Sequence, residues 1–405
     1  MRAAVEGSVQ RGDSPLALRL VNSLAWFWYL RGRHREGHRS LALALGLSGG
    51  SSPTTAAWEA GFAMLTGGGT GLRERGRAAL GGLGPHDARS RWFLAFAHLH
   101  FGDVATGKEL NDRALAAFRA LGDRWGEAAA LSSRAKQATF QGDFATAERS
   151  GADSLALFTT LGDGWGRLQA SDMLGHLAEI NGDYDRAVRL HREGLRTAEG
   201  LRLWTDVSYR LSSFGRIALL TGDFARSAEF HERGMRLAAE QANAFAEQFA
   251  RVGLDLVARR TGEFDRAEAH FRAALAWDRR LHTDYGAPFY GLTLLLAELG
   301  FLAEQRGDAE SARALHCQGL AAAREMGDPR AIALAQEGLA GAAALAGDFR
   351  EAAHLLETAG ALRASLGTPL PPAERGDVDR ISARVRAALG EDALTAAFRE
   401  SGAAR

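Results

Sequence analysis

Three basic side chains recur at intervals of 40 residues: Lys136, His176 and Arg216. Basic groups aligned along one face can hold a carboxylate, such as an acidic side chain or the C-terminus of a peptide, through charge-assisted hydrogen bonds. Asp172 and Glu179 lie close to them in the sequence and could instead neutralise them. Two alternatives therefore stay open, a stripe that contacts a ligand and a solvated, self-paired surface.

Other residues with chemical potential form weaker patterns. Residues 46–50 (Gly-Leu-Ser-Gly-Gly) match the nucleophile motif of hydrolases, but that motif needs a strand before it and a helix precedes it here. His34 and His38 could share one helix face, yet zinc would need a further ligand. The single cysteine, Cys317, allows neither an intrachain disulfide nor a cysteine-based metal site. We expect no catalytic, cofactor or metal site, and no enzyme.

Composition and charge exclude several classes of partner. The 405 residues are 46% hydrophobic, and 49 basic residues balance 49 acidic ones. Nothing in this balance indicates the basic face that nucleic acids require. The longest apolar stretch, residues 24–30, is far too short to span a bilayer, and residues 1–10 lack the apolar core of a signal peptide. We expect a cytoplasmic protein without direct nucleic-acid or membrane contact.

An acidic residue after a glycine punctuates most of the chain at a nearly constant spacing. The successive distances are 40, 40, 40, 40, 45 and 40 residues. Glycine can adopt the left-handed conformation that ends a helix, and the acidic residue can cap the helix that follows. The pairs are Gly102-Asp103, Gly142-Asp143, Gly182-Asp183, Gly222-Asp223, Gly262-Glu263, Gly307-Asp308 and Gly347-Asp348.

A second punctuation falls midway between these sites. It reads Leu-Gly-Asp at residues 121–123 and 161–163, and Met-Gly-Asp at residues 326–328. Each repeat is therefore predicted to contain two helices of roughly 17 to 19 residues joined by short turns. The sequence thus predicts an all-α chain built from stacked helical hairpins.

Small residues at fixed offsets inside the repeat would let two helices approach closely. Leu174-Gly175 and Leu299-Gly300 resemble the Leu-Gly pair of tetratricopeptide repeats, although the usual period there is 34 residues and here it is about 40. The resemblance covers residues 87–366. It implies a right-handed superhelical solenoid of about nine hairpins. Asp255 departs from the small-residue pattern, and we expect a local distortion near it.

The repeat pattern divides the chain into three parts. They are residues 1–101, with irregular hairpins, residues 102–366, with the regular repeats, and residues 367–405, with capping helices. The irregular hairpins are predicted at residues 14–30, 33–45, 52–65 and 70–80. The cap is predicted as two short helices near residues 373–389 and 391–400, because a solenoid must cover its last apolar face.

The tetratricopeptide resemblance also implies where a ligand would lie. In that family the first helix of each hairpin lines a concave groove. The residues predicted to face a protein or peptide there are Lys136, His176, Arg216, Glu179, Arg259, Tyr209 and Phe301. Two other sets recur with the repeat, and we interpret both as packing between helices. They are His191, His231 and His316, and Trp125, Trp165 and Trp204, for which a ligand platform is the alternative.

Two segments resemble a more specific class of proteins within the tetratricopeptide-repeat group. They are residues 26–37 (Trp-Phe-Trp-Tyr-Leu-Arg-Gly-Arg-His-Arg-Glu-Gly) and residues 364–375 (Ala-Ser-Leu-Gly-Thr-Pro-Leu-Pro-Pro-Ala-Glu-Arg). Both look like the tetratricopeptide region that ends large actinobacterial transcription regulators of the antibiotic-regulator and LuxR-like classes. In that family a DNA-binding portion and a nucleotide-binding ATPase portion come first, and this sequence contains no Gly-x-x-x-x-Gly-Lys-Ser/Thr motif. The resemblance implies a sensor or regulatory module, with that ATPase portion as a partner.

Two further functions stay open. A free-standing adaptor or peptide receptor would use the same groove, whereas an enzyme would need convergent titratable groups in a closed pocket. A homodimer is a further expectation if the aromatic patch at residues 26–29 is exposed, although this patch could equally form the N-terminal core.

Overall fold

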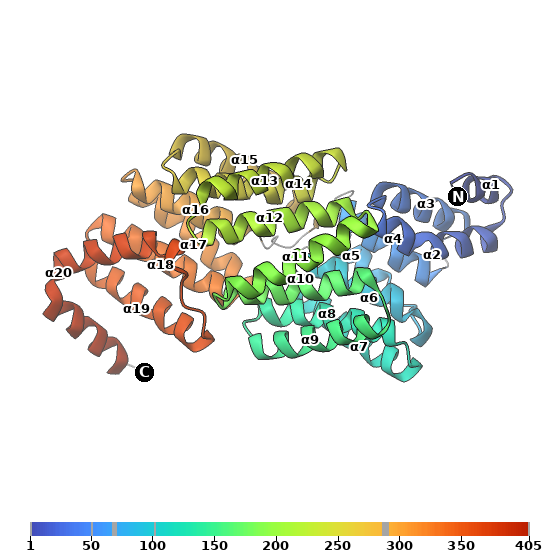
Figure 1. The fold of residues 1–405 in the computed structure, drawn as a ribbon, viewed down its shortest axis with the longest axis horizontal. Helices are drawn as coiled ribbons and strands as arrows, with labels where there is room; N and C mark the ends of the chain where they lie inside the picture. Colours follow the sequence, from blue (N-terminus) through green and yellow to red (C-terminus); the bar gives the residue numbers. More distant parts are fainter. Residues whose placement is uncertain (1, 50–51, 67–70, 101–102, 286–290, 404–405) are drawn as a thin grey trace.

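The computed structural model describes residues 2–49, 52–66, 71–100, 103–285 and 291–403, and within these ranges it contains helices and no strands. The predicted all-α solenoid of helical hairpins is confirmed (Figure 1). The α-helices are α1 (Arg2–Gln10), α2 (Ser14–Leu30), α3 (His34–Leu47), α4 (Pro53–Thr66), α5 (Leu72–Ala78), α6 (Ala88–His100), α7 (Val104–Leu121), α8 (Arg124–Phe140), α9 (Phe144–Thr160), α10 (Gly164–Ile180), α11 (Tyr184–Leu201), α12 (Trp204–Leu220), α13 (Phe224–Glu240), α14 (Ala244–Arg260), α15 (Phe264–Tyr285), α16 (Leu292–Gln305), α17 (Ala309–Met326), α18 (Pro329–Ala346), α19 (Phe349–Leu366) and α20 (Gly376–Ala403). Two short 3₁₀ helices are η1 (Pro85–Asp87) and η2 (Pro372–Glu374).

The helix boundaries follow the predicted punctuation. Gly142 has φ 75°, and Asp143 accepts a hydrogen bond from the Thr146 backbone N–H at 3.0 Å at the start of α9. The same arrangement starts α11, where Asp183 accepts from the Arg186 backbone N–H at 3.0 Å. Each of these aspartates caps its helix, because its side chain accepts a hydrogen bond from one of the backbone N–H groups left unpaired in the first turn. The sequence pattern therefore determines where most hairpins turn.

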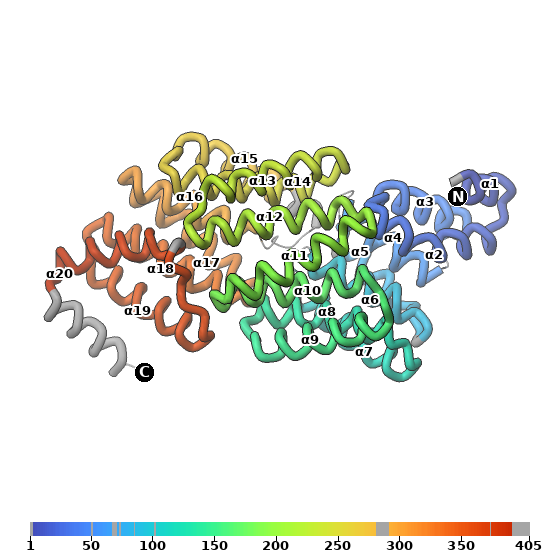
Figure 2. The backbone as a smooth tube through the Cα atoms, in the orientation of Figure 1, coloured from blue at the N-terminus to red at the C-terminus, as the bar shows by residue number. Residues whose placement is uncertain are grey.

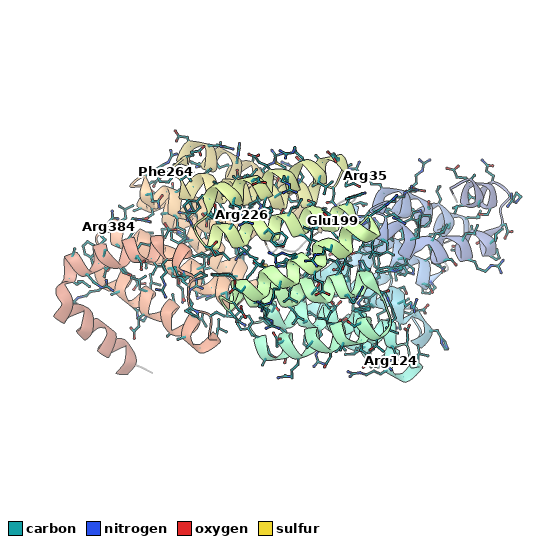
Figure 3. The ribbon with its side chains drawn as sticks, viewed as in Figure 1. Arg35, Arg124, Glu199, Arg226, Phe264 and Arg384 are labelled. Atoms are coloured by element: carbon teal, nitrogen blue, oxygen red, sulfur yellow. The ribbon has the colours of Figure 1, made fainter. Side chains whose placement is uncertain are left out.

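The hairpins place their two helices in different surroundings. The first helices of the hairpins from α6 onward (α6, α8, α10, α12, α14, α16 and α18) are called the inner helices here, and their partners the outer helices. Inner helices such as α8 and α10 pack directly against one another. α10 is buried along most of its length, whereas the outer helix α11 buries one stripe, Ala187, His191, Gly194 and Ala198. Charged side chains of outer helices, such as Glu199 on α11 and Arg226 on α13, are exposed to solvent (both are labelled in Figure 3).

Buried histidines separate neighbouring inner helices. A Cβ atom on Gly253 would lie 2.2 Å from the His231 ring, and one on Gly338 would lie 2.0 Å from the His316 ring. Each imidazole thus fills the space that a missing side chain leaves, so the packing interpretation of these two histidines is confirmed. Both rings are buried, their nitrogens have no hydrogen-bond partner among the described residues, and burial lowers the pKa of each to about 4.

The expected distortion at Asp255 is wrong. α14 runs without interruption from Ala244 to Arg260. The Asp255 carboxylate lies 2.7 Å from Nδ1 of His270 on the partner helix α15. This contact pairs one oxygen of the buried carboxylate without bending the helix, while Oδ2 has no hydrogen-bond partner among the described residues.

The N-terminal aromatic patch is part of the interior. The Trp26 ring on α2 packs against three other tryptophans, with centroid distances of 5.6 Å to Trp92, 5.3 Å to Trp125 and 4.7 Å to Trp165. These three belong to the consecutive inner helices α6, α8 and α10. The patch at residues 26–29 therefore forms core, which was one of its two open interpretations. Trp204, by contrast, is 41% exposed.

The end of the chain folds back against the inner helices. Residues 368–389, here called the return segment, contain η2 and the first part of α20, and Gly390 interrupts α20 with non-helical angles. The predicted break between two C-terminal helices is thus confirmed. η2 contacts α12, and the end of α19 meets the turn before α9, because a Cβ on Gly142 would lie 2.9 Å from Leu366. In the backbone trace of Figure 2, α18 and α19 lie at the end of the molecule opposite to the N-terminal helices α1 and α2.

Substitution of Gly338 tests the histidine packing. Gly338→Ala forces a Cβ into the His316 ring, and overpacking of this kind should lower the free energy of unfolding by about 1–3 kcal/mol. Urea denaturation measures the change. The control is Gly360→Ala, because a Cβ on Gly360 in α19 would have no atom within 4 Å. It should be neutral or stabilising by up to about 1 kcal/mol. Equal effects of the two substitutions would refute the packing account.

Candidate functional site

The three basic residues of the predicted stripe lie on three consecutive inner helices. Lys136 is on α8, His176 on α10 and Arg216 on α12. The side chains of His176 and Arg216 are 36% and 31% exposed, and Lys136 is half-buried. Partial exposure leaves these groups open to a ligand, while neighbouring protein atoms still reduce their solvation. The structure joins His176 and Arg216 through one carboxylate and leaves Lys136 apart from it.

That carboxylate is Glu179. It is buried, and its Oε1 lies 2.8 Å from His191 Nε2, while Arg216 Nε donates to Oε2 at 3.2 Å. His176 Nδ1 lies 3.8 Å from Oε2. Burial alone would raise the pKa of Glu179, but hydrogen bonds from His176 and His191 outweigh it and hold the pKa well below its ordinary range. Glu179 is therefore an ionised anchor that positions two of the predicted ligand contacts.

A second carboxylate extends this network along the inner helices. Arg210 donates to Asp172, and its guanidinium also lies 3.3 Å from His191 Nδ1. Burial would raise the pKa of Asp172, but the Arg210 guanidinium holds it below the ordinary value. The contacts of Asp172 and Glu179 match the self-paired alternative for this part of the stripe. Arg216 keeps a second side of its guanidinium for another partner.

Lys136 is the least neutralised cation of the stripe. Its Nζ lies 3.4 Å from His100 Nε2, and no carboxylate of the described residues lies within ion-pair distance of it. Burial lowers the pKa of Lys136 to about 8, with Asp172 partly opposing the change. Burial also lowers the pKa of His100 to about 3, so this neighbour is neutral near pH 7 and supplies no counter-charge. A ligand carboxylate at Lys136 would therefore meet an unpaired ammonium group.

The remaining predicted contacts are more enclosed. Arg259 and Phe301 are buried, with the guanidinium carbon 5.6 Å from the centre of the Phe301 ring. Arg259 donates to Asp377 of the return segment at 3.2 and 2.6 Å, and also to Glu298. The half-buried Tyr209 packs its ring 5.7 Å from Phe249. The return segment therefore covers Arg259 and Phe301, and sequence reasoning did not anticipate this.

Arg216 has a second partner, also from the return segment. One Nη atom of Arg216 lies 3.8 Å from Oε1 of Glu374 in η2. The Arg330 guanidinium on α18 stands within electrostatic reach of both groups, and its buried Nε has no hydrogen-bond partner among the described residues. Sequence reasoning missed Glu374, Asp377 and Arg330, because only the closure of the superhelix brings them to the stripe. The available signal was three acidic residues, Glu374, Asp377 and Asp379, in a segment otherwise rich in arginine.

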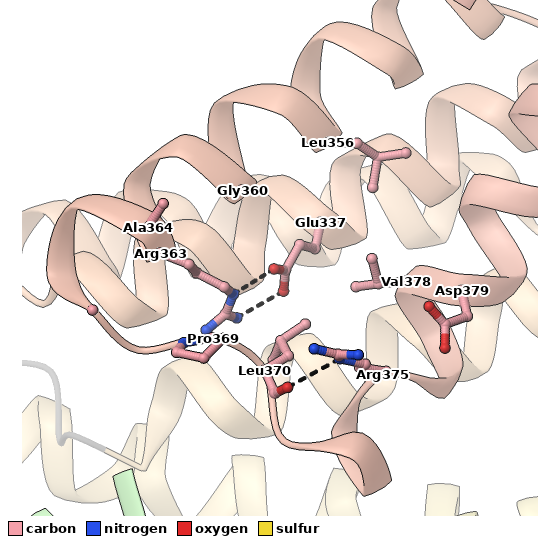
Figure 4. A pocket seen from close by; sticks show the side chains of 11 residues that line it. Glu337, Leu356, Gly360, Arg363, Ala364, Pro369, Leu370, Arg375, Val378 and Asp379 are labelled. Atoms are coloured by element: carbon pink, nitrogen blue, oxygen red, sulfur yellow. Dashed lines mark hydrogen bonds and ion pairs between the residues drawn. The ribbon is translucent and has the colours of Figure 1, made fainter. Parts of the chain in front are cut away.

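A pocket of about 510 Å³ lies between α18, α19 and the return segment. Figure 4 shows the Arg363–Glu337 pair across its wall, with hydrogen bonds of 2.5 and 2.8 Å. Arg375 donates to the Leu370 backbone carbonyl at 3.1 Å on the opposite wall. These side chains are thus held by partners inside the chain, and the pocket marks where the return segment leaves α19.

The sequence matches no protein-family model and no curated protein. Among solved structures, it is similar to a Rap protein complexed with competence and sporulation factor, with a TM-score of 0.64 and 11% identity over 87% of this chain and 98% of that one. The apo form of RapI has a TM-score of 0.46 and 10% identity over 87% and 99% of the two chains. A signal transduction ATPase with a tetratricopeptide-repeat sensor, from Pyrococcus horikoshii, has a TM-score of 0.45 and 12% identity. The match covers 88% of this chain and 55% of that one.

This chain has the fold of a tetratricopeptide-type helical-repeat solenoid. Identities this low show the fold alone. The narrower resemblance to antibiotic-regulator and LuxR-like proteins stays a prediction, as do the predicted ligand contacts.

The described residues contain neither a cluster of metal ligands nor a helix that could span a membrane. No group of three or more His, Cys, Asp or Glu side chains among them is placed to hold a metal ion. No helix in the described part of the chain is both long and apolar enough to cross a membrane.

Replacement of Glu179 tests the network at the centre of the stripe. Glu179→Gln removes a buried charge between His191 and Arg216 and should lower the free energy of unfolding by about 3 kcal/mol at pH 7. Because the folded-state pKa is depressed, this charge stabilises the fold above its ordinary pKa of 4.5, and that contribution disappears as the pH falls further. The variant should therefore lose less stability than the wild type between pH 6 and pH 3.

Urea denaturation over this pH range measures both effects. Glu193→Gln is the matched control, because Glu193 is exposed on the outer helix α11. It should change the free energy of unfolding by less than about 0.5 kcal/mol. Parallel pH profiles for Glu179→Gln and the wild type would show that Glu179 is not an ionised anchor.

Proposed function

We propose that this chain is a non-catalytic scaffold that binds an acidic peptide or protein segment along its inner helices. The single observation that carries the proposal is that carboxylates of the chain's own return segment already lie against two predicted ligand contacts. Glu374 pairs with Arg216, and Asp377 pairs with Arg259. The inner helices therefore accept acidic polypeptide, and the cations beyond Glu374 are left for a second one.

The part of the stripe left for the ligand begins at Arg216 and runs through His176 to Lys136. His176 and Arg216 are partly exposed, and Lys136 has no carboxylate partner among the described residues. A ligand carboxylate here would form charge-assisted hydrogen bonds in a poorly solvated setting, where they are stronger than at an open surface. Shape and charge along several repeats would then determine which segment binds.

The fold likeness is consistent with this role. The Rap protein that shares the fold was solved complexed with competence and sporulation factor. A scaffold of inner helices that holds a polypeptide ligand would use the same architecture. The charged groups of the stripe are neutralised mainly by one another, as the contacts of Glu179 show, and this arrangement suits binding better than proton transfer.

A finer proposal concerns regulation. We propose that the module is the sensor of a larger ATPase-containing transcription regulator, with a free-standing adaptor or peptide receptor as the alternative. The resemblance of residues 26–37 and 364–375 to such regulators supports the first. Both segments pack against the inner helices. A ligand that binds to the inner helices would therefore alter the contacts of the two segments that carry the resemblance. Stimulation or inhibition of ATP hydrolysis by a regulator ATPase portion when mixed with this chain would separate the two alternatives.

A peptide selection tests the binding role. The full chain is immobilised and challenged with a random peptide display library, and selected peptides are expected to be net acidic. The double variant Lys136→Gln/His176→Gln should bind them at least about tenfold more weakly, because each lost charged hydrogen bond contributes about 1.5–3 kcal/mol. Fluorescence anisotropy with the selected peptides measures the affinity.

The matched control is Arg192→Glu, because Arg192 is exposed on the outer helix α11. It should leave the affinity unchanged, and added salt should weaken binding to the wild type. Selected peptides that are neutral or basic, or that bind the double variant as well as the wild type, would contradict the proposal.

A further inference from the structure

The return segment lies along the inner helices with one anchor on each successive repeat. Glu374 reaches Arg216 on α12, and Asp377 reaches Arg259 on α14. The next anchors are Arg380, which donates to Glu304 on α16, and Ile381, whose side chain packs at Gly341 on α18. Arg216 and Gly341 stand at the repeat position that also holds His176 and Phe301. Arg259 and Glu304 stand three residues later in the repeat, at the position that also holds Glu179. The segment is therefore laid out as a peptide ligand of a helical-repeat groove would be.

The anchors differ in how firmly they are held. Ile381 and Val385 are buried in a cluster with Phe301 and several alanines of α18 and α19. Asp377 has three further partners, Arg260 at 3.6 Å, Gln305 at 3.1 Å and Arg380 at 2.8 Å. These contacts fix the helical part of the return segment in the core.

Glu374 is held much less firmly. Its side chain is 32% exposed, and among the described residues its one ion pair is the 3.8 Å contact with Arg216. η2, which carries it, is a single turn closed by backbone hydrogen bonds from Glu374 to Pro371 at 2.9 Å and from Arg375 to Pro372 at 3.3 Å. A turn of this kind can be lifted without removing the buried side chains that follow it.

The surroundings of Glu374 contain cations as well as carboxylates, and the carboxylates within its electrostatic reach are Glu298 and Glu337. Arg216 and Arg330 both stand within its electrostatic reach, and the buried Nε of Arg330 lacks a hydrogen-bond partner among the described residues. The row of cations continues to His176 and Lys136. A carboxylate that replaced Glu374, followed by a second one directed towards α10 and α8, would neutralise the site more completely than Glu374 does.

We propose that η2 is a built-in competitor for the peptide site and that the partner is an acidic peptide whose carboxylate displaces Glu374 from Arg216. This inference rests on the proposed function and adds its regulation. α20 stays in the core when the peptide binds, and η2 is released. Binding is thereby coupled to exposure of residues 368–375, which belong to the segment 364–375 that resembles the regulator proteins.

The test uses the full chain and a fluorescein-labelled synthetic peptide with the sequence of residues 368–380, so that the probe presents the same carboxylates. Glu374→Gln removes the internal competitor's charge and should bind this peptide at least fivefold more tightly than the wild type, by fluorescence anisotropy. Asp379→Asn is the matched control, because it removes one carboxylate of the same segment that is exposed. It should bind the peptide as the wild type does.

Hydrogen exchange monitored by mass spectrometry supplies a second readout that needs no peptide. Residues 368–375 should exchange faster in Glu374→Gln than in the wild type, while residues 381–389 stay protected in both. Unchanged exchange at residues 368–375, or equal or absent peptide binding by Glu374→Gln and the wild type, would overturn the inference. Display-selected acidic peptides that bind wild type and Glu374→Gln equally would leave the proposed function standing and remove only the competitor.

Discussion

A buried arginine must be neutralised, and Arg259 shows how this requirement shapes the molecule. Its guanidinium lies in the interior over the Phe301 ring, where an unpaired charge would be very unfavourable. Glu298 from the next inner helix supplies one carboxylate, and Asp377, 118 residues away in the sequence, supplies the other. Burial raises the pKa of Glu298 to about 7, although the Arg259 guanidinium opposes the shift. The chain must therefore return to the middle of its own solenoid.

The same logic extends along the inner helices. Their small residues allow close approach, the His316 ring fills the gap between Gly300 and Gly338, and the charged side chains that remain must find partners in a confined space. At the N-terminal end the inner helices are covered by an aromatic side chain, since Trp26 of α2 packs on their tryptophans. At the C-terminal end they are covered by the acidic side chains of the return segment. Between the two lies the stretch around Lys136, where the cations are least neutralised and where we propose that a ligand binds.

Much of this architecture could be predicted from the sequence. The glycine–aspartate punctuation located the turns, because left-handed glycines and capping aspartates act within a few residues, as at Gly142 and Asp143. The register of the repeat placed Lys136, His176 and Arg216 on equivalent turns. The C-terminal helices were predicted, but the contacts of the return segment were not, because Glu374 and Asp377 meet their arginines only after the superhelix has closed. The distortion expected at Asp255 is absent for a local reason, since a histidine on the paired helix contacts its carboxylate and α14 stays regular.

The central claim is that the Arg259–Asp377 pair holds the return segment on the inner helices, and a double-mutant cycle tests it most directly. Free energies of unfolding are measured by urea denaturation for the wild type, Arg259→Met, Asp377→Asn and the double variant. We predict that the double variant is more stable than the sum of the single effects implies, by about 2 kcal/mol or more, because each single change removes one charged partner from a buried charge. Additive effects within about 0.5 kcal/mol would contradict the account and would show that the segment is held without this pair.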